Sequence, residues 1–382
     1  IKGSNNHVTG AGDGGFLYSK FSNPILFSDA MIENSFTSKG GGGAFAVFSS
    51  KIALERVTVR RCLAGKRGGG GLLLNGEAEA HVFDIVMDDN VATLGGSGGH
   101  IRVSGSSLII HQINIEMTWP ASVPVFTNDH ILVTRSGTSL TQGTASAFGG
   151  TVSCISSVSN EVAMVSNTKE EGLLSCQSTL YDYHTQKESK FICPSKGVHL
   201  GSGSTVQSST AIKGGGALSA NLCSIEMSNT SIINSTSTNG NGGAILLGLE
   251  STLRVGKSSQ FVNNKAVKGS GGAIACTECD SILFNQSTAF EHNYAGLEGG
   301  AVHLVTPANK ISSAGSIFIG NTAAVNGGAI HSYQGDWTST GDRYEQNSAV
   351  SGSGGALSMT ASHLNLDATT TCQNNRAIKG GG

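Results

Sequence analysis

Cysteine has the widest chemical repertoire of the residue types in this chain, and two of its eight cysteines, Cys276 and Cys279, are spaced Cys-x-x-Cys. A structural zinc site would need two further ligands at matching spacing, and the sequence contains no second pair of this kind. A thioredoxin-like redox motif would need a neighbouring βαβ pattern, which is also absent. We therefore expect a local disulfide at a turn, or pairing elsewhere. The other disulfide candidates are Cys154, Cys176 and Cys193.

Two histidines, His303 and His331, occupy the same place in two consecutive copies of a sequence repeat that is described below. If successive copies stack, the two imidazoles lie close together, where they could bind a metal ion or titrate together. Both places fall on the outward side of the predicted strands. We therefore expect a surface pair without a chemical role, and the sequence predicts neither a metal site nor a cofactor.

The densest acidic cluster consists of Asp84, Asp88 and Asp89. Parallel β-helix polysaccharide lyases and hydrolases use clustered carboxylates to bind calcium or to act as acid and base. Asp84 and Asp88 share the parity of one strand face, but no neighbouring repeat supplies aligned acids or an Arg base. We therefore predict no catalytic residues.

Glycosylation sequons of the form Asn-x-Ser/Thr begin at Asn229, Asn234 and Asn285. In a eukaryotic host they would support secretion, and Asn229 and Asn285 are then the candidate glycosylation sites. Asn234 is expected at a buried position of the repeat, where no glycan could be attached. In a bacterium the same sequons would carry little meaning.

The element that positions these side chains is a Gly-Gly pair followed by a small and then an aliphatic or aromatic residue, which recurs along the chain. Outside the middle, the pairs follow one another at steps of 27 to 29 residues, a spacing too regular for chance. Glycine permits a positive φ and a close approach of two backbones, as a corner requires. The clearest copies place their second glycine at Gly43, Gly216, Gly243, Gly272, Gly300, Gly328 and Gly355.

A second motif, an aromatic or apolar residue followed at the third place by Asn, precedes the glycine pairs. In the first half Met31 or Met87 replaces the aromatic residue, giving Met31…Asn34 as one weaker copy, and Cys62 takes an Asn place. The aromatic residues of the clear copies are Phe261, Phe290, Phe318 and Tyr344. The Asn residues are Asn264, Asn293, Asn321 and Asn347, with Asn375 in a copy that has Cys in the aromatic place.

Both motifs indicate stacked coils of short strands. After each glycine pair, apolar residues alternate with small or polar ones, as in a strand with one face inward. One coil cannot bury its inner face alone, whereas stacked coils can. The aromatic residues would then stack in the core, and the Asn residues would form an amide ladder. The predicted fold is an all-β, right-handed, pectin-lyase-like parallel β-helix, about 12–13 coils of ~28 residues and about 60 Å long.

Together, the Gly-Gly-Ala-(Ile/Leu/Val) and Phe-x-x-Asn motifs resemble the passenger repeats of the chlamydial polymorphic membrane proteins, which look like autotransporter adhesins. The resemblance covers residues 215–382 well and residues 1–105 moderately. Similar repeats occur in cell-surface proteins of some eukaryotic microbes. The resemblance implies an extracellular β-helical segment that acts in adhesion.

The repeats divide the chain into three parts of one continuous solenoid. Residues 1–105 and 207–382 carry regular repeats, whereas residues 106–206 carry degenerate coils and a cysteine-containing insertion. The repeats run to both termini without a visible cap, so we expect an excerpt of a longer chain. Such a segment, expressed alone, is expected to associate end to end.

In the middle part, the glycine steps lengthen to 51 residues, from Gly99 to Gly150, and then to 66 residues, from Gly150 to Gly216. The first long step could contain two coils with one motif lost, whereas the second must carry extra chain. The segment around residues 155–204 is expected to project from the rod as a loop, and loops on rigid scaffolds often contact partners.

The composition limits the function. Charged residues make up 13% and the formal net charge is −2, which gives no attraction to nucleic acid. No apolar run is long enough to span a membrane. We expect an extracellular or cell-surface location and a non-enzymatic rod that adheres to protein or glycan or acts as a spacer. The alternatives are a structural subunit of an extracellular filament, built from other copies of the chain, and a carbohydrate-active β-helix enzyme.

Overall fold

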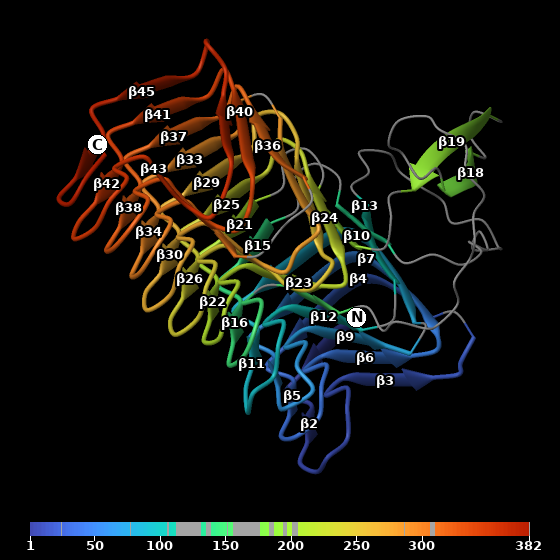
Figure 1. Cartoon of the computed structure of the whole chain (residues 1–382). Helices are drawn as coiled ribbons and strands as arrows, with labels where there is room; N and C mark the ends of the chain where they lie inside the picture. The colour runs from blue at the N-terminus through green and yellow to red at the C-terminus, as the bar shows by residue number, and fades with distance from the viewer. Residues whose placement is uncertain are drawn as a thin grey trace.

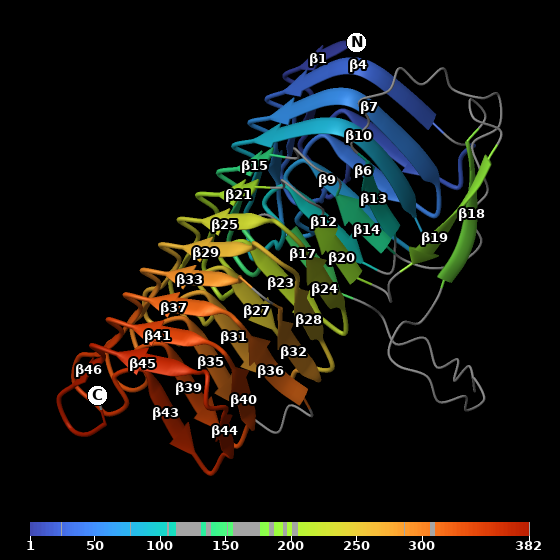
Figure 2. The same ribbon diagram turned by 90° about the horizontal axis from the view of Figure 1, so that it is seen from above.

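The computed structural model describes residues 1–23, 25–76, 78–104, 107–111, 131–134, 139–150, 152–155, 176–182, 187–193, 197–200, 205–285, 287–305 and 310–381. These residues form strands, turns and bends, and no helix among them is long and apolar enough to cross a membrane. Most of the strands stack into four sheets, of which three run from the first coils to the last and the fourth begins at β14 (Ile131–Thr134) (Figures 1 and 2). We call them the aromatic sheet, the short sheet, the post-glycine sheet and the fourth sheet.

The aromatic sheet contains β1 (Lys2–Ser4), β4 (Ile25–Glu33), β7 (Lys51–Arg60), β10 (Glu79–Asp88), β13 (Ser107–His111), β15 (Ser139–Thr141), β21 (Thr205–Gln207), β25 (Ser231–Ile233), β29 (Gln260–Val262), β33 (Ala289–Glu291), β37 (Ile317–Ile319), β41 (Arg343–Glu345) and β45 (Thr371–Gln373). The short sheet contains β2 (His7–Val8), β5 (Phe36–Thr37), β8 (Leu63–Ala64), β11 (Val91–Ala92), β16 (Thr144–Ala145), β22 (Thr210–Ala211), β26 (Thr236–Ser237), β30 (Lys265–Ala266), β34 (Tyr294–Ala295), β38 (Thr322–Ala323), β42 (Ser348–Ala349) and β46 (Arg376–Ala377).

The post-glycine sheet contains β3 (Leu17–Lys20), β6 (Phe45–Phe48), β9 (Leu72–Asn75), β12 (Ile101–Ser104), β17 (Val152–Ile155), β23 (Leu218–Asn221), β27 (Ile245–Leu247), β31 (Ile274–Thr277), β35 (Val302–Val305), β39 (Ile330–Tyr333) and β43 (Leu357–Thr360). The fourth sheet contains β14 (Ile131–Thr134), β20 (Gly197–Leu200), β24 (Ser224–Met227), β28 (Thr252–Val255), β32 (Ser281–Phe284), β36 (Lys310–Ala314), β40 (Trp337–Thr340) and β44 (Leu364–Leu366).

The pairing within these sheets confirms the predicted parallel β-helix. One coil runs from the fourth sheet through the aromatic and short sheets to the post-glycine sheet, as in β32, β33, β34 and β35. The register joins residues about one repeat apart, for example Phe261 with Phe290, in parallel. The short sheet contributes 12 strands in the described part of the chain.

The middle of the chain keeps this stacking across both long glycine steps. Strand β11 pairs directly with β16, and β12 pairs directly with β17, so the 51-residue step is one coil with an insertion. The suggestion of two coils there is wrong, since no equivalent strand lies between these pairs. The 66-residue step is also one coil with an insertion, as predicted, and it carries the antiparallel strands β18 (Cys176–Asp182) and β19 (Lys187–Cys193).

The predicted aromatic stack fills the core of the second half. Phe261, Phe290, Phe318 and Tyr344 are fully buried. Neighbouring rings along this series are parallel within 9°, and their centroids lie 4.7–4.9 Å apart. Because the coil spacing of a parallel sheet is also close to 4.8 Å, stacked rings fit the repeat without gaps.

The predicted amide ladder is also present, at the corner between the aromatic and short sheets. It runs through Asn264, Asn293, Asn321, Asn347 and Asn375. From Asn293 onward, each Oδ1 accepts hydrogen bonds from the backbone N–H and the Nδ2 of the Asn one coil earlier, at 2.9–3.1 Å. Each Nδ2 also donates to the backbone oxygen at the aromatic place of the preceding coil, at 2.9–3.0 Å. The ladder therefore satisfies polar groups that the corner buries.

Two Asn positions were misplaced by one residue. Asn234 is exposed, and buried Ser235 takes the ladder position, since its N–H donates to Oδ1 of Asn264 at 3.0 Å. In the same way, Asn34 precedes the buried Ser35. The residue before the ladder position has a positive φ, 54° at Asn234 and 52° at Asn34. Asn tolerates this conformation better than most residues, so an Asn can mark either of the two adjacent places.

The two positions of each glycine pair require glycine for different reasons, as Gly299 and Gly300 show. Gly299 has a φ of 65°, which favours glycine. Gly300 has no such φ, but a Cβ there would overlap the backbone oxygen of Gly328 in the next coil. Backbone atoms of the next coil block a Cβ in the same way at Gly43, Gly216, Gly243, Gly272, Gly328 and Gly355.

Candidate functional site

One cluster of three metal-ligating side chains occurs among the described residues, and it consists of Glu298, His303 and His331. One ligand atom from each lies within 4.8 Å of the others. His303 on β35 and His331 on β39 are register partners, and their rings are stacked with centroids 5.4 Å apart and planes 10° apart. Nε2 of His331 lies 3.4 Å from Oε2 of Glu298, which stands directly before a glycine pair.

The expectation that the two histidines lie on the surface is wrong, because His303 is only 6% and His331 only 4% exposed. Their side chains leave the strands on the side away from the core, but the residue before a glycine pair covers the outward residue of the next coil. Glu298 covers His331 in this way. The same relation holds elsewhere in the repeat. Gly214 precedes a glycine pair, and a Cβ added to it would lie 2.7 Å from Cδ2 of Leu246, the outward residue of the next coil. Strand alternation thus gives the direction of a side chain but not its exposure.

Burial decides the charge state of the two imidazoles. Burial, and to a smaller extent the charge of His331, lowers the pKa of His303 to about 3. Burial also lowers the pKa of His331, although the carboxylate of Glu298 acts in the opposite direction. Nδ1 of each histidine is buried without a hydrogen-bond partner. Both rings are therefore neutral near pH 7, and each carries a lone pair on one nitrogen.

Glu298 is held by the residues that precede the neighbouring glycine pairs. Nδ2 of Asn326 donates to Oε1 of Glu298 at 2.9 Å, and the backbone N–H of Glu298 donates to Oγ of Ser270 at 3.3 Å. The same ladder continues on both sides, since Ser270 donates to Asn241 and Ser353 donates to Asn326 through their backbone N–H groups. These contacts orient the carboxylate toward the histidines.

Two disulfides lie at the corner that follows the post-glycine sheet. Cys276 and Cys279 form the predicted local disulfide within one coil. Cys154 is bonded to Cys223, which the sequence did not single out, across 69 residues that include the second insertion. A cross-link that closes a loop of this length stabilises the folded chain by about 4 kcal/mol in the chain-entropy model. Cys154 and Cys276 are both buried and belong to equivalent strands of the post-glycine sheet.

The remaining cysteine prediction concerns the inserted strands β18 and β19. Their backbones place Cys176 directly opposite Cys193, and the side chains of both lie outside the described part. The described free cysteines are Cys62, which is buried, and Cys372, which is exposed. Neither belongs to a cluster of three metal-ligating side chains among the described residues.

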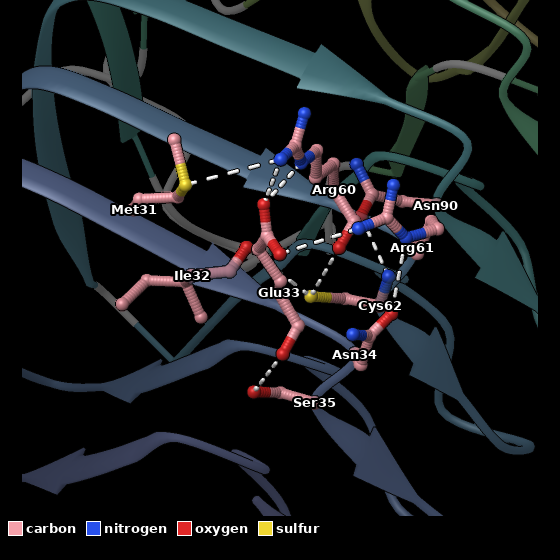
Figure 3. Close-up of polar contacts among 9 residues, drawn as sticks. All are labelled: Met31, Ile32, Glu33, Asn34, Ser35, Arg60, Arg61, Cys62 and Asn90. Atoms are coloured by element: carbon pink, nitrogen blue, oxygen red, sulfur yellow. Dashed lines mark hydrogen bonds and ion pairs between the residues drawn. The ribbon is translucent and has the colours of Figure 1, made fainter. Parts of the chain in front are cut away.

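Figure 3 shows the corner between the aromatic and short sheets in the first half of the chain. On its inner side, Cys62 takes an Asn place as predicted, and its backbone N–H donates to Oδ1 of Asn90 at 3.0 Å. On the outer side, Glu33 accepts hydrogen bonds from both Arg60 and Arg61 of the next coil. Exposed pairs of this kind contribute about 0–1 kcal/mol each, so the outer side adds little to the stability that the core supplies.

A buried carboxylate, Asp342, lies next to Tyr344, the last ring of the aromatic stack. Its Oδ1 accepts from Ser313 Oγ at 3.0 Å and from the backbone N–H of Ser316 at 2.7 Å. Its Oδ2 accepts from Ser339 Oγ at 2.6 Å and from the Tyr344 hydroxyl at 3.4 Å. Burial raises the pKa of Asp342, although these hydrogen bonds lower it. All five residues are buried, so the cluster has a structural role.

The other candidate residues fall on the outer surface or outside the described side chains. The side chain of Asp84 is not described, whereas Asp88 lies in register with Arg60 and Asp89 is exposed. Asn229 and Asn285 are exposed, as a glycosylation site requires, and whether they carry glycans stays a prediction. 

Searches with family models, against curated proteins and against solved structures found no match to this chain. The resemblance to the chlamydial repeats therefore stays a prediction. The two disulfides indicate an oxidising, non-cytoplasmic environment, because thiols are kept reduced in the cytosol of most organisms.

Proposed function

We propose that this chain is a non-enzymatic extracellular rod that adheres to a protein or glycan at a cell surface or holds another domain away from it. The observation that carries the proposal is the unbroken stacking of coils from β2 to β46 in the short sheet. A parallel β-helix of this kind is stiff, because every coil between the first and the last is hydrogen-bonded to two neighbours. Stiffness over this length suits a spacer or a display scaffold.

The use of the buried polar side chains supports a non-enzymatic role. The Asn ladder serves only backbone and amide groups of neighbouring coils. Asp342 is enclosed by hydroxyl and backbone donors. Asp88 of the acidic cluster lies in register with Arg60 on one neighbouring strand and with Thr141 on the other.

The hairpin β18–β19 is the proposed contact site for a partner. It forms a two-stranded sheet of its own, apart from the four stacks (Figures 1 and 2). In the sequence it lies between the two coils that the Cys154–Cys223 disulfide joins. A loop on a rigid base can be presented to a partner without loss of the scaffold.

Beads coated with the purified chain provide the test. We expect them to bind a host-cell surface or a glycan array, and replacement of residues 176–193 by a Gly-Ser linker should reduce binding while circular dichroism stays unchanged. Binding that is unchanged in this variant would exclude the hairpin as the contact site. Release of oligosaccharides from a polysaccharide panel by the purified chain would contradict the proposal, as would spontaneous assembly into long filaments.

A further inference from the structure

We propose that Glu298, His303 and His331 form a binding site for a divalent first-row transition-metal ion, with Zn²⁺ as the best probe. Two imidazoles and one carboxylate are the ligand types that such ions prefer, and three protein ligands suffice for Zn²⁺ when water completes the coordination. The site lies outside the core of the rod, and the inference goes beyond the proposed function.

The geometry brings the three ligands together from two coils. The register of β35 and β39 places His303 directly beside His331, and the ligand atoms of the cluster lie within 4.8 Å of one another. Zinc bonds of about 2.0–2.2 Å require ligand atoms roughly 3–4 Å apart, so only a small closing movement is needed. The carboxylate of Glu298 can supply part of it, because its side chain is 30% exposed.

The burial of two polar rings at one place is a second observation. Nδ1 of His303 and Nδ1 of His331 are buried and have no hydrogen-bond partner. Burying polar atoms without partners is unfavourable. At the same strand position, the coils on either side carry Ala275 and Ser358. The histidine pair is therefore a local departure from the repeat, and it brings two desolvated imidazoles to one carboxylate.

The supporting contacts resemble those of a metal site. Asn326 donates to Oε1 of Glu298, while Oε2 is the oxygen nearest to His331. A hydrogen bond of this kind leaves one carboxylate oxygen free for the ion and fixes its direction. Since Glu298 belongs to the segment before the glycine pair and the histidines belong to the post-glycine sheet, a bound ion would fasten that segment to two successive coils.

The experiment measures binding of Zn²⁺ to the chelator-treated full chain by competition with a chromophoric chelator and by calorimetry. We expect one ion per chain. Glu298→Gln and His331→Gln should each weaken binding at least roughly tenfold, and Asn326→Ala should weaken it less. His363→Gln is the matched control, because His363 also faces a carboxylate, Asp336, but its side chain is 93% exposed.

Thermal unfolding gives a second measurement that does not depend on the chelator. Zn²⁺ should raise the Tm of the wild type and of His363→Gln but not that of Glu298→Gln, whose near-identical shape preserves the fold. The proposal is overturned if Zn²⁺ neither binds nor shifts the Tm of the wild type. It is equally overturned if Glu298→Gln and His331→Gln bind as the wild type does, or if binding is lost only in His363→Gln.

Discussion

Replacing Asn321 by Ala removes one rung from the middle of the amide ladder. Oδ1 of Asn321 accepts from the backbone N–H and the Nδ2 of Asn293, at 3.1 and 2.9 Å. Its Nδ2 donates to the backbone oxygen of Phe290 and to Oδ1 of Asn347, at 2.9 and 3.0 Å. The substitution therefore removes four hydrogen bonds in a place that water cannot easily reach.

The expected cost follows from the groups that lose their partner. The backbone N–H of Asn293 and the backbone oxygen of Phe290 lose the bonds that Asn321 made, whereas Oδ1 of Asn347 still accepts from the backbone N–H of Asn321 at 3.0 Å. Each buried group left unpaired costs about 1–3 kcal/mol. We expect Asn321→Ala to lower the free energy of unfolding by about 3–5 kcal/mol.

Urea unfolding followed by tryptophan fluorescence measures this cost. Trp337 is 1% exposed, and its ring centroid lies 6.3 Å from that of Phe318. Phe318 belongs to the same coil as Asn321. It therefore reports on the coils around the substitution, once the second tryptophan is replaced by Phe. The control is Asn239→Ala, because Asn239 is exposed, and it should change the free energy by no more than about 0.5 kcal/mol.

Asn321→Asp separates hydrogen bonding from side-chain volume. An aspartate keeps the shape but, when ionised, cannot donate to Phe290 or Asn347. Burial should raise its pKa in the folded chain, so the variant should lose stability relative to the wild type as the pH rises above about 4. If Asn321→Ala costs less than about 1 kcal/mol and Asn321→Asp shows no such pH dependence, then the ladder is not what stabilises this corner.

Three further predictions concern the core, the glycine corner and the buried acid. Phe290→Ala should cost about 3–5 kcal/mol in urea unfolding, because it empties a stacked aromatic place, and a cost below about 1 kcal/mol would contradict the stack. Gly300→Ala should strongly reduce the Tm, because its Cβ meets the backbone oxygen of Gly328, whereas Gly10→Ala has open space and should leave the Tm nearly unchanged. Burial raises the pKa of Asp342, so the folded chain binds that proton more tightly than the unfolded chain does. The destabilisation due to Asp342 is therefore absent below about pH 4 and develops as the pH rises toward the pKa in the folded chain, and Asp342→Asn should remove this part of the pH profile.

The repeat period by itself determined most of the fold. A 27- to 29-residue step with one aromatic place, one Asn place and one glycine pair has few solutions other than stacked coils. Identical side chains at identical places must then meet their copies about one strand spacing away. For this reason the Phe290 stack, the Asn321 ladder and the role of Gly300 could be predicted without coordinates.

What the period could not determine is where an individual coil departs from its neighbours. The register at Asn234 was missed because Asn suits both the ladder and the left-handed residue before it. The partner of Cys154 was missed because the disulfide crosses an insertion that hides the spacing to Cys223. Only the paired backbones of β11 and β16 showed that the first insertion adds no coil.

The histidine cluster shows most clearly what only the tertiary structure decided. The sequence placed His303 and His331 side by side and pointing away from the core, and both statements are correct. It also implied that they face solvent, which is wrong. Exposure depends on the segment before the glycine pair, which folds over the strand of the next coil and brings Glu298 to His331. Period and alternation describe a residue within its own strand, whereas burial and ligand geometry depend on chain from another coil.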